Sequence, residues 1–186
     1  MAKFETAYKL TCGQEGGYSN SSHDKGGETY RGISRKWFPE WKGWKVIDSY
    51  KANHDLQQGE YINDFVLEEL VYDFFEAEFW DANRLSEITS QEIANEVYDT
   101  AVNMGKNTAA VYLQKAVNLL NRNQKDYNDI KVDGHIGTAT LSLVNRYPNS
   151  AVLIKVLNGL QFACYLQICE KDPDQEYNFR GWLNRV

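Results

Sequence analysis

Two acidic residues near the amino terminus have the types and the spacing that acid–base chemistry needs. Glu15 follows a short amphipathic segment, and Asp24 comes nine residues later in a glycine-rich stretch. Glycosidases use such a pair, with one carboxyl group as proton donor and the other as base or charge stabiliser. The donor must stay protonated near neutral pH, and the negative end of a helix dipole disfavours its anion. A surface helix end followed by a turn would produce the same pattern, so the residues alone leave both readings open.

The elements that must position these residues can be predicted from periodicity. Segment 4–12 has apolar residues at helical spacing, and the glycine pair Gly16 and Gly17 is expected to stop that helix. Residues 18–34 are rich in Ser, Asn, Asp and Gly, which predicts a loop with a small hairpin. Residues 37–61 look irregular. Helical patterns follow over 64–83, 91–104, 108–120, 138–147 and 149–171, with a polar loop over 121–129.

The order of these elements predicts a mainly α protein of two lobes. A front lobe, residues 1–88, would hold the loop or hairpin region and both acidic residues. A back lobe, residues 89–186, would be all-helical. The best candidate for a boundary between the lobes lies near residues 86–90, where the loop-rich front part of the chain gives way to the helical back part.

Composition excludes several classes of partner. The formal net charge is −6, and binding of nucleic acid requires a basic face. No apolar run reaches the length of a membrane span, so we expect no stable membrane insertion. The three cysteines are an odd number and do not indicate a disulfide framework, and buried thiols are favoured. The first ten residues lack the uninterrupted apolar core of a secretory signal.

The glycine-rich segment resembles the start of the glycoside hydrolase family 108 muramidases, relatives of the phage-type lysozymes. The matching motifs are Glu15-Gly16-Gly17-Tyr18, Asp24-Lys25-Gly26-Gly27-Glu28-Thr29 and Gly32-Ile33. Family members often carry proline where Lys25 stands. The back half resembles the peptidoglycan-binding region usually fused to that domain, in segments 101–105, 113–116, 132–141 and 181–186.

The resemblance implies a lysozyme-like fold and an N-acetylmuramidase that cuts the β-1,4 bond between N-acetylmuramic acid and N-acetylglucosamine. Carried over by motif, Glu15 is the general acid, and Asp24 with Thr29 holds the attacking water. Thr29 stands one residue out of register with the family pattern. Two alternatives remain: a lytic transglycosylase, which needs only one catalytic Glu, and a non-catalytic protein that binds the wall or assists secretion.

Further residues are candidates for substrate binding. They are Tyr18, Gly26, Gly27, Trp41 and Trp44. Apolar sugar faces stack on aromatic rings, yet a loop clamped by its own indoles is the favoured interpretation of the Trp-rich segment. We expect no cofactor and no metal site, because the three histidines lack ligand spacing. Pairing of Cys12 with His23 as a peptidase is disfavoured against a core thiol.

The expected partner is peptidoglycan, with a possible holin or secretion machinery. The resemblance fits a phage or prophage endolysin, or a secretion-associated enzyme that opens the wall. We expect synthesis in the bacterial cytoplasm and action in the periplasm or cell wall after export by a route without a signal peptide. The turn around Asp133 and Gly134 either binds the wall or is purely structural.

Overall fold

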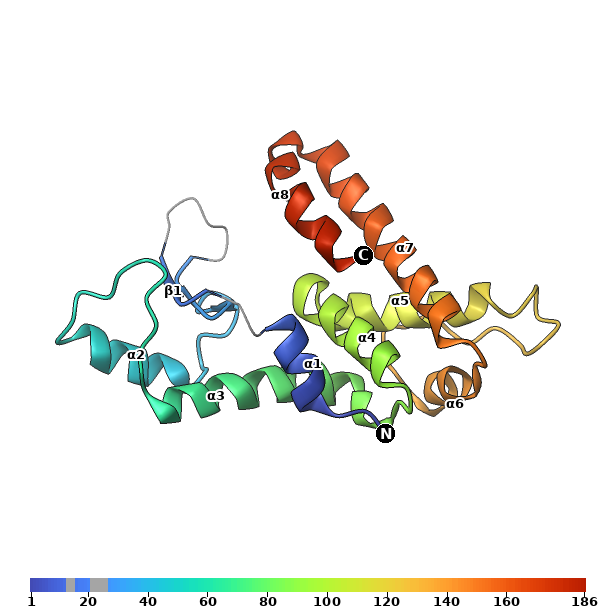
Figure 1. Ribbon diagram of the computed structural model, residues 1–186, viewed down its shortest axis with the longest axis horizontal. Coiled ribbons are helices and arrows are strands. Elements are labelled where there is room, and N and C mark those ends of the chain that lie inside the picture. The colour runs from blue at the N-terminus through green and yellow to red at the C-terminus, as the bar shows by residue number, and fades with distance from the viewer. Residues whose placement is uncertain (13–15, 21–26) are drawn as a thin grey trace. The chain divides into compact units, whose positions relative to one another are not determined.

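The computed structural model describes residues 1–12, 16–20 and 27–186. The chain forms two compact units, Cys12–Ala77 and Met1–Thr11 with Glu78–Val186, which we call the sheet unit and the helical unit. Helices make up most of the described chain (Figure 1), so the predicted mainly α fold is confirmed. The predicted lobes, 1–88 and 89–186, are continuous in sequence, whereas the helical unit takes in both ends of the chain. As domains they stay predictions.

The sheet unit contains three short antiparallel strands in the order β1-β2-β3. They are β1 (Tyr18–Ser19), β2 (Thr29–Tyr30) and β3 (Ile33–Ser34). Tyr18 pairs with Tyr30, and Ser19 pairs with Thr29. The β2–β3 turn is Arg31-Gly32, with φ of 49° and 79°, and two residues of positive φ suit the tightest hairpin turns. The hairpin expected within 18–34 is therefore present.

Gly17 is required by a close approach between two segments. The Tyr18 amide donates to the Glu60 carbonyl at 2.8 Å, and the Gly59 amide donates to the Tyr18 carbonyl at 2.7 Å. A Cβ on Gly17 would lie 2.1 Å from the Glu60 carbonyl oxygen, which is a steric clash. Glycine, which has no Cβ, avoids this clash. The helix α1 ends earlier, at Thr11, so this glycine serves the packing of β1 rather than the end of the helix.

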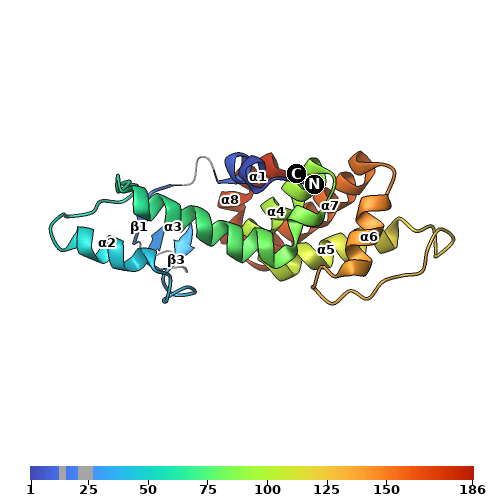
Figure 2. The same ribbon diagram turned by 90° about the horizontal axis from the view of Figure 1, so that it is seen from below.

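Two helices complete the sheet unit, α2 (Gly43–Lys51) and α3 (Phe65–Phe75). They lie side by side in Figures 1 and 2. The Asp64 carboxylate caps α3 by accepting from the Leu67 amide at 2.9 Å. Helix α2 was not predicted, because its buried large residues are only Trp44 and Ile47, one turn apart, which is too few to reveal a helical period.

The predicted helix over 64–83 changes its winding partway. After α3 comes a π-helical turn, Glu76–Trp80, and then two 3₁₀ turns, Asp81–Asn83 and Leu85–Glu87. Trp80, which the pattern places in the core, is 1% exposed. It packs against Phe4 with ring centroids 5.7 Å apart.

The helical unit is built around α4. Its helices are α1 (Phe4–Thr11), α4 (Gln91–Met104), α5 (Lys106–Leu119), α6 (Thr138–Arg146), α7 (Ser150–Lys171) and α8 (Glu176–Trp182), with 3₁₀ turns at Pro173–Gln175 and Leu183–Arg185. Helix α4 packs against α1, α5 and α7. Ile93, Val97 and Ala101 are buried, as their spacing predicts. Gly105, with φ of 91°, ends α4 at the predicted residue.

The expectation that no segment reaches the length of a membrane span is wrong for α7. Its 22 residues are long and apolar enough to cross a bilayer by length and composition. The core helix of a soluble protein meets the same criterion when it is mostly buried, whereas 22% of the apolar window of α7 is buried. One side of α7 is buried in the helical unit, where the Gln161 amide donates to the Tyr165 hydroxyl at 2.8 Å and accepts from Thr100 at 3.3 Å. A buried polar network of this kind is typical of a packed core.

Candidate active site

Some of the predicted catalytic and binding residues lie within the described ranges, and others lie outside them. Glu15, Asp24 and Gly26 lie outside the described residues, as does His23. Thr29, Tyr18 and Gly27 are described, and all three belong to the sheet or its immediate flank. Glu15 comes two residues before Gly17 in sequence, and Asp24 comes three residues before Gly27. The catalytic assignments therefore stay predictions. The described residues show which contacts fix the backbone near Glu15 and Asp24 in sequence.

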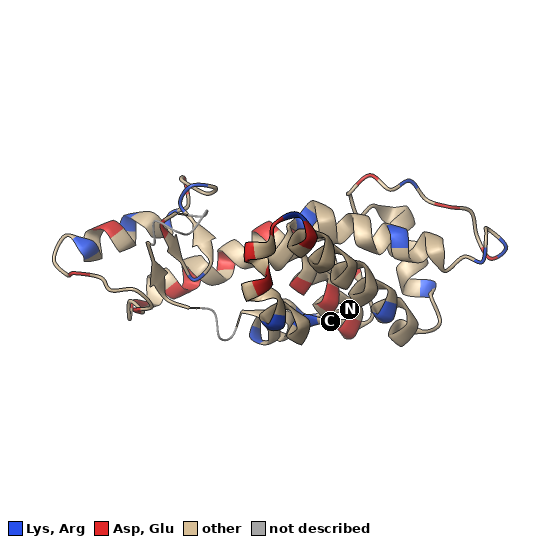
Figure 3. Cartoon of the chain, turned by 90° about the horizontal axis from the view of Figure 1, so that it is seen from above, with Lys and Arg blue, Asp and Glu red and all other residues tan. Residues whose placement is uncertain are grey.

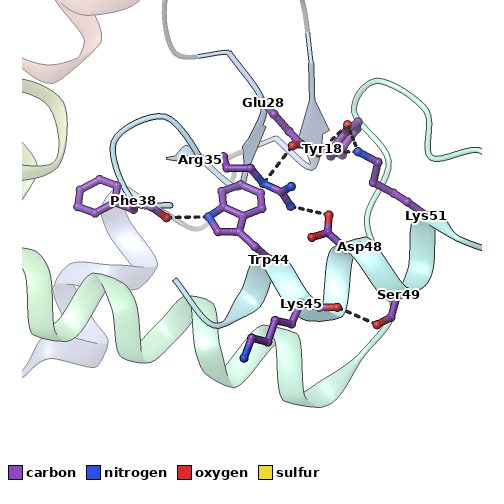
Figure 4. A network of polar contacts seen from close by, with 9 residues as sticks. All are labelled: Tyr18, Glu28, Arg35, Phe38, Trp44, Lys45, Asp48, Ser49 and Lys51. Carbon is purple, nitrogen blue, oxygen red and sulfur yellow. Dashed lines mark hydrogen bonds and ion pairs between the residues drawn. The ribbon is translucent and has the colours of Figure 1, made fainter. Parts of the chain in front are cut away.

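A carboxylate at the start of β2 joins several elements of the sheet unit. Glu28 Oε1 accepts from the Tyr18 hydroxyl at 3.0 Å and from Lys51 Nζ at 2.7 Å. Its second oxygen lies 3.1 Å from Arg35 Nε. Figure 4 shows these side chains converging from β1, from the segment after β3 and from the end of α2. The side chain of Glu28 is only 14% exposed, so its charge is held against two cations with little water around it.

The same network extends to the buried indole of α2. Arg35 Nη2 donates to Asp48 Oδ1 at 2.6 Å, and its guanidinium lies 4.5 Å from the centroid of the Trp44 ring. The hydrogen bond to Glu28, followed by the one to Tyr18, raises the pKa of Lys51, so this lysine stays charged throughout the neutral range. The network thereby holds β1, β2 and α2 in one arrangement beside Gly27 and Thr29.

The two tryptophans predicted for sugar binding both pack within the sheet unit. Trp44 is 4% exposed and donates from its indole to the Phe38 carbonyl at 2.8 Å. Trp41 donates to the Leu70 carbonyl at 3.2 Å. A Cβ on Gly43 would lie 2.2 Å from the Trp41 ring, so glycine there lets the indole pack closely. This is the clamped-loop interpretation; sugar contact by either ring stays a prediction.

The neighbouring Trp37 differs from these two. It is 67% exposed, and Lys36 Nζ lies 5.1 Å from the centroid of its ring. An exposed indole face is the kind of surface on which a sugar stacks.

Gly27 and Thr29 flank Glu28, and Thr29 is the first residue of β2. Gly27 has φ of 66°, a left-handed conformation that L side chains rarely adopt. Its predicted part in substrate binding stays a prediction. Thr29 pairs with Ser19 on one side and with Ser34 on the other, in the middle strand of the sheet. Its role in holding water stays a prediction.

A polar hollow of about 480 Å³ lies beside Tyr18. Its lining includes amide side chains from Asn20, Gln57 and Gln58 together with the Lys51 amine. Gln58 is fixed there, since its amide donates to Ser19 Oγ at 3.0 Å. Amide groups that donate and accept, next to an aromatic ring, match the many hydroxyl and acetamido groups of an aminosugar chain. Asn20 is also the residue that leads into the stretch carrying Asp24.

The sequence alone did not indicate Glu28, Arg35 or Lys51 as parts of this region. Glu28 falls inside the glycine-rich motif, but nothing in one sequence shows that its partners lie 7 and 23 positions further along. Among the described residues there is no group of three or more His, Cys, Asp or Glu side chains placed to hold a metal ion.

Comparison with known proteins identifies the family. Residues 8–105 match the model of the family described as glycosyl hydrolase 108, and residues 108–186 match a model described as a predicted peptidoglycan domain. The structure is similar to that of SagA from Brucella abortus, with a TM-score of 0.65, 20% sequence identity, and coverage of 98% of this chain and 88% of that one. No curated protein matches the sequence.

These matches agree with the resemblance seen in the motifs at both ends of the chain. The structural similarity supports a lysozyme-like, mainly α fold. The first family model covers more than half of the 186 residues, and the second covers most of the rest. The chain therefore belongs to the glycosyl hydrolase 108 family, and it is a glycoside hydrolase that acts on peptidoglycan.

Proposed function

We propose that this hydrolase is an N-acetylmuramidase, which cleaves the β-1,4 bond between N-acetylmuramic acid and N-acetylglucosamine. Glu15 is its general acid, and Asp24 with Thr29 holds the attacking water. The observation that carries this proposal is the anchoring of the sheet around both motifs. Gly17 is pinned against the Glu60 carbonyl, and Glu28 fixes the start of β2. In sequence, Glu15 thus comes two residues before one anchored position and Asp24 four residues before the other.

The substrate fits the polar hollow beside Tyr18, whose amide side chains supply donors and acceptors for a glycan. Tyr18 takes part in the Glu28 network through its hydroxyl. It also lines the hollow, where Lys51 Nζ lies 5.3 Å from the centroid of its ring. Lys51 contributes an ammonium donor at the same place, and Asp55 contributes a carboxylate acceptor. Together they form a surface suited to an aminosugar chain rather than to a nucleic acid or an apolar ligand.

The general-acid role is tested by replacing Glu15 with Gln. Turnover of purified peptidoglycan should fall ~10²–10⁴-fold, the usual contribution of a general acid, while the thermal melt stays unchanged. Glu5→Gln is the matched control, because Glu5 is an exposed carboxylate on α1 that pairs with Lys9 at 2.6 Å. Full activity in Glu15→Gln would refute the assignment.

The reaction outcome follows from the proposed water-holding pair. An inverting hydrolase keeps its carboxyl groups roughly 6.5–9.5 Å apart to admit water, against about 5–5.5 Å in a retaining one. We expect inversion, so fresh product should carry a reducing N-acetylmuramic acid end as the α-anomer. Mass spectrometry of the digest checks the end group and early NMR checks the anomer. A majority of 1,6-anhydro ends would establish a transglycosylase instead.

The biological setting belongs to the same proposal. The wall lies outside the cytoplasm, so an enzyme made in the cytoplasm needs a holin or a secretion machinery to reach it, as an endolysin or a wall-opening enzyme does. Expression in a bacterial host with and without a co-expressed holin tests this. Rapid lysis should require the holin and an intact Glu15; lysis of equal rate without the holin would contradict the route.

A further inference from the structure

A second pocket lies in the helical unit, among residues that belong to the predicted peptidoglycan domain. Its volume is about 750 Å³, within the range of small-molecule and peptide sites. One wall is the end of α5 with the loop 121–129, and the other is the end of α6 with the residues that follow it. In Figure 1 this loop extends from α5 and returns toward α6. We call this site the loop pocket.

The loop that forms one wall is held in a strained conformation. Arg122, Asn123 and Gln124 have φ of 53°, 57° and 62°, and a left-handed conformation costs an L residue about 1–2 kcal/mol. Asn121, which is 2% exposed, maintains it. Its oxygen accepts from the Gln124 amide at 2.9 Å, and its nitrogen donates to Asp129 Oδ1 at 2.5 Å. Strain that the surrounding contacts enforce is found at ligand clamps.

The floor and walls of the loop pocket are apolar and aromatic. Leu119, Leu143 and Pro148 line it together with the rings of Tyr127 and Tyr147. Tyr127 is fixed by its hydroxyl, which donates to the Val117 carbonyl at 2.7 Å. None of the described lining residues carries an amide or an aliphatic hydroxyl. A glycan needs many such partners, so this lining does not suit a sugar chain.

The charged groups of the loop pocket favour an anion. Arg122 is paired with Asp126, so the charges of these two residues cancel. Arg146 also lines the pocket, and its Nε donates to the Ser142 carbonyl at 3.1 Å. Among the described residues no carboxylate is paired with it. The pocket therefore has a net positive charge within a chain of formal net charge −6, and both signs are visible along the loop in Figure 3.

We propose that the loop pocket binds the stem peptide of peptidoglycan, with a peptide carboxylate on Arg146 and the alanine methyl groups against the leucines and tyrosines. Guanidinium groups bind carboxylates through strong, charge-assisted hydrogen bonds. The stem peptide is the part of peptidoglycan that combines small apolar side chains with free carboxylates. This inference rests on peptidoglycan being the substrate, and it assigns glycan and peptide to two different sites. A bound peptide raises the local concentration of the attached glycan.

The test uses the full chain and a soluble probe, the tetrapeptide L-Ala–γ-D-Glu–meso-diaminopimelate–D-Ala. Titration calorimetry should detect binding by the wild type and at least a ~10-fold higher Kd for Arg146→Gln, the loss expected for one charged hydrogen bond. Arg180→Gln is the control, because Arg180 is an exposed arginine of α8 in the same unit. Backbone amide shifts on titration should cluster at residues 119–127 and 143–148.

Two results would overturn the proposal: no binding by the wild type at millimolar peptide, or equal affinity in all three proteins. If Arg146→Gln melts early, Arg122→Gln replaces it, and its affinity should fall as well. The probe contains no glycosidic bond, so its binding does not depend on which bond the enzyme cuts. The proposed muramidase activity is judged separately, from the end groups of the digest.

Discussion

Glu28 is the residue that holds the start of β2, and it does so through two cations and a phenol. Glu28→Gln removes the negative charge and leaves Lys51 and Arg35 close together. We expect the free energy of unfolding to fall by about 1–3 kcal/mol, the cost of disrupting hydrogen bonds to a charged group. Turnover should fall as well, because the variant loses the contacts that fix residue 28, which lies between Gly27 and Thr29.

Urea unfolding and initial rates on purified peptidoglycan measure both effects. Glu40→Gln serves as the control, since Glu40 is an exposed glutamate of the same unit. The double variant Glu28→Gln with Lys51→Met should lose less stability than the sum of the two single variants, because both remove the same ion pair. Strict additivity, or a Glu28→Gln protein with unchanged stability and rate, would remove Glu28 from the proposed role.

At the scale of elements, α4 carries a glutamate that titrates near neutral pH. Burial, followed by the charge of Asp99, raises the pKa of Glu96 from 4.5 to about 7. Asp99 is itself paired with Arg185 at 2.8 Å. The Asn158 amide of α7, in the orientation that satisfies both its oxygen and its nitrogen, donates to Glu96 Oε1 at 2.9 Å.

A raised carboxyl pKa in the folded state makes the free energy of unfolding decrease as the pH rises. Between pH 4.5 and about 7 the folded chain binds this proton more tightly than the unfolded chain, so the contribution of Glu96 to stability declines as pH rises through that window. Glu96→Gln should abolish a decline on the order of 3 kcal/mol. Urea unfolding at pH 5 and pH 8 measures it, with the exposed Glu92→Gln on the same helix as control. A parallel pH dependence in wild type and Glu96→Gln would argue against the shift.

The turn at Asp133 and Gly134 is held against helix α5 by hydrogen bonds to one buried side-chain amide, that of Gln114. Gln114 Oε1 accepts from the Asp133 and Gly134 amides, both at 3.0 Å. Its nitrogen donates to Asp133 Oδ1 and to the His135 carbonyl, both at 2.9 Å. These hydrogen bonds, with that from the His135 amide, hold the pKa of Asp133 below its usual range. The residues of the turn are thus explained by structure, whether or not the turn also touches the wall.

Gln114→Leu should destabilise the chain by about 2–3 kcal/mol, because it leaves buried amide groups of the turn without acceptors. The Asp133 pKa should rise toward the value of a free aspartate. Thermal melts and an NMR titration of the Asp133 carboxyl test both effects. The control is Gln167→Leu, at an exposed position of α7, which should change neither the melting temperature nor the Asp133 pKa. If Gln114→Leu melts at the same temperature as the wild type, the Gln114 hydrogen bonds do not stabilise the turn.

At the scale of the whole molecule, the family boundary does not coincide with a compact unit. The hydrolase match ends at residue 105, directly after α4, yet α4 packs against α5 and α7 within the helical unit. A fragment 1–105 would keep α1 and α4 but expose the apolar side of α4 that α5 and α7 cover. Removing such a face from its partners abolishes cooperative folding.

We therefore expect the fragment 1–105 to retain helical circular dichroism without a cooperative thermal transition, and the fragment 108–186 to behave in the same way. The full chain under identical conditions is the reference. A sharp transition in either fragment, close to that of the full chain, would mean that the two family segments fold independently.

The sequence by itself determined most helices of the helical unit and the order of the motifs around Glu15 and Asp24. Amphipathic spacing and glycine-rich turns are local properties, and they predicted the end of α4 at Gly105 and the burial of Trp80. Only the tertiary structure decided that Glu28 contacts Lys51 and Arg35, and that residues of the 121–129 loop line a pocket. Such contacts form between segments far apart in the chain, and a charge or a polar loop has no preferred partner until the fold brings one within reach.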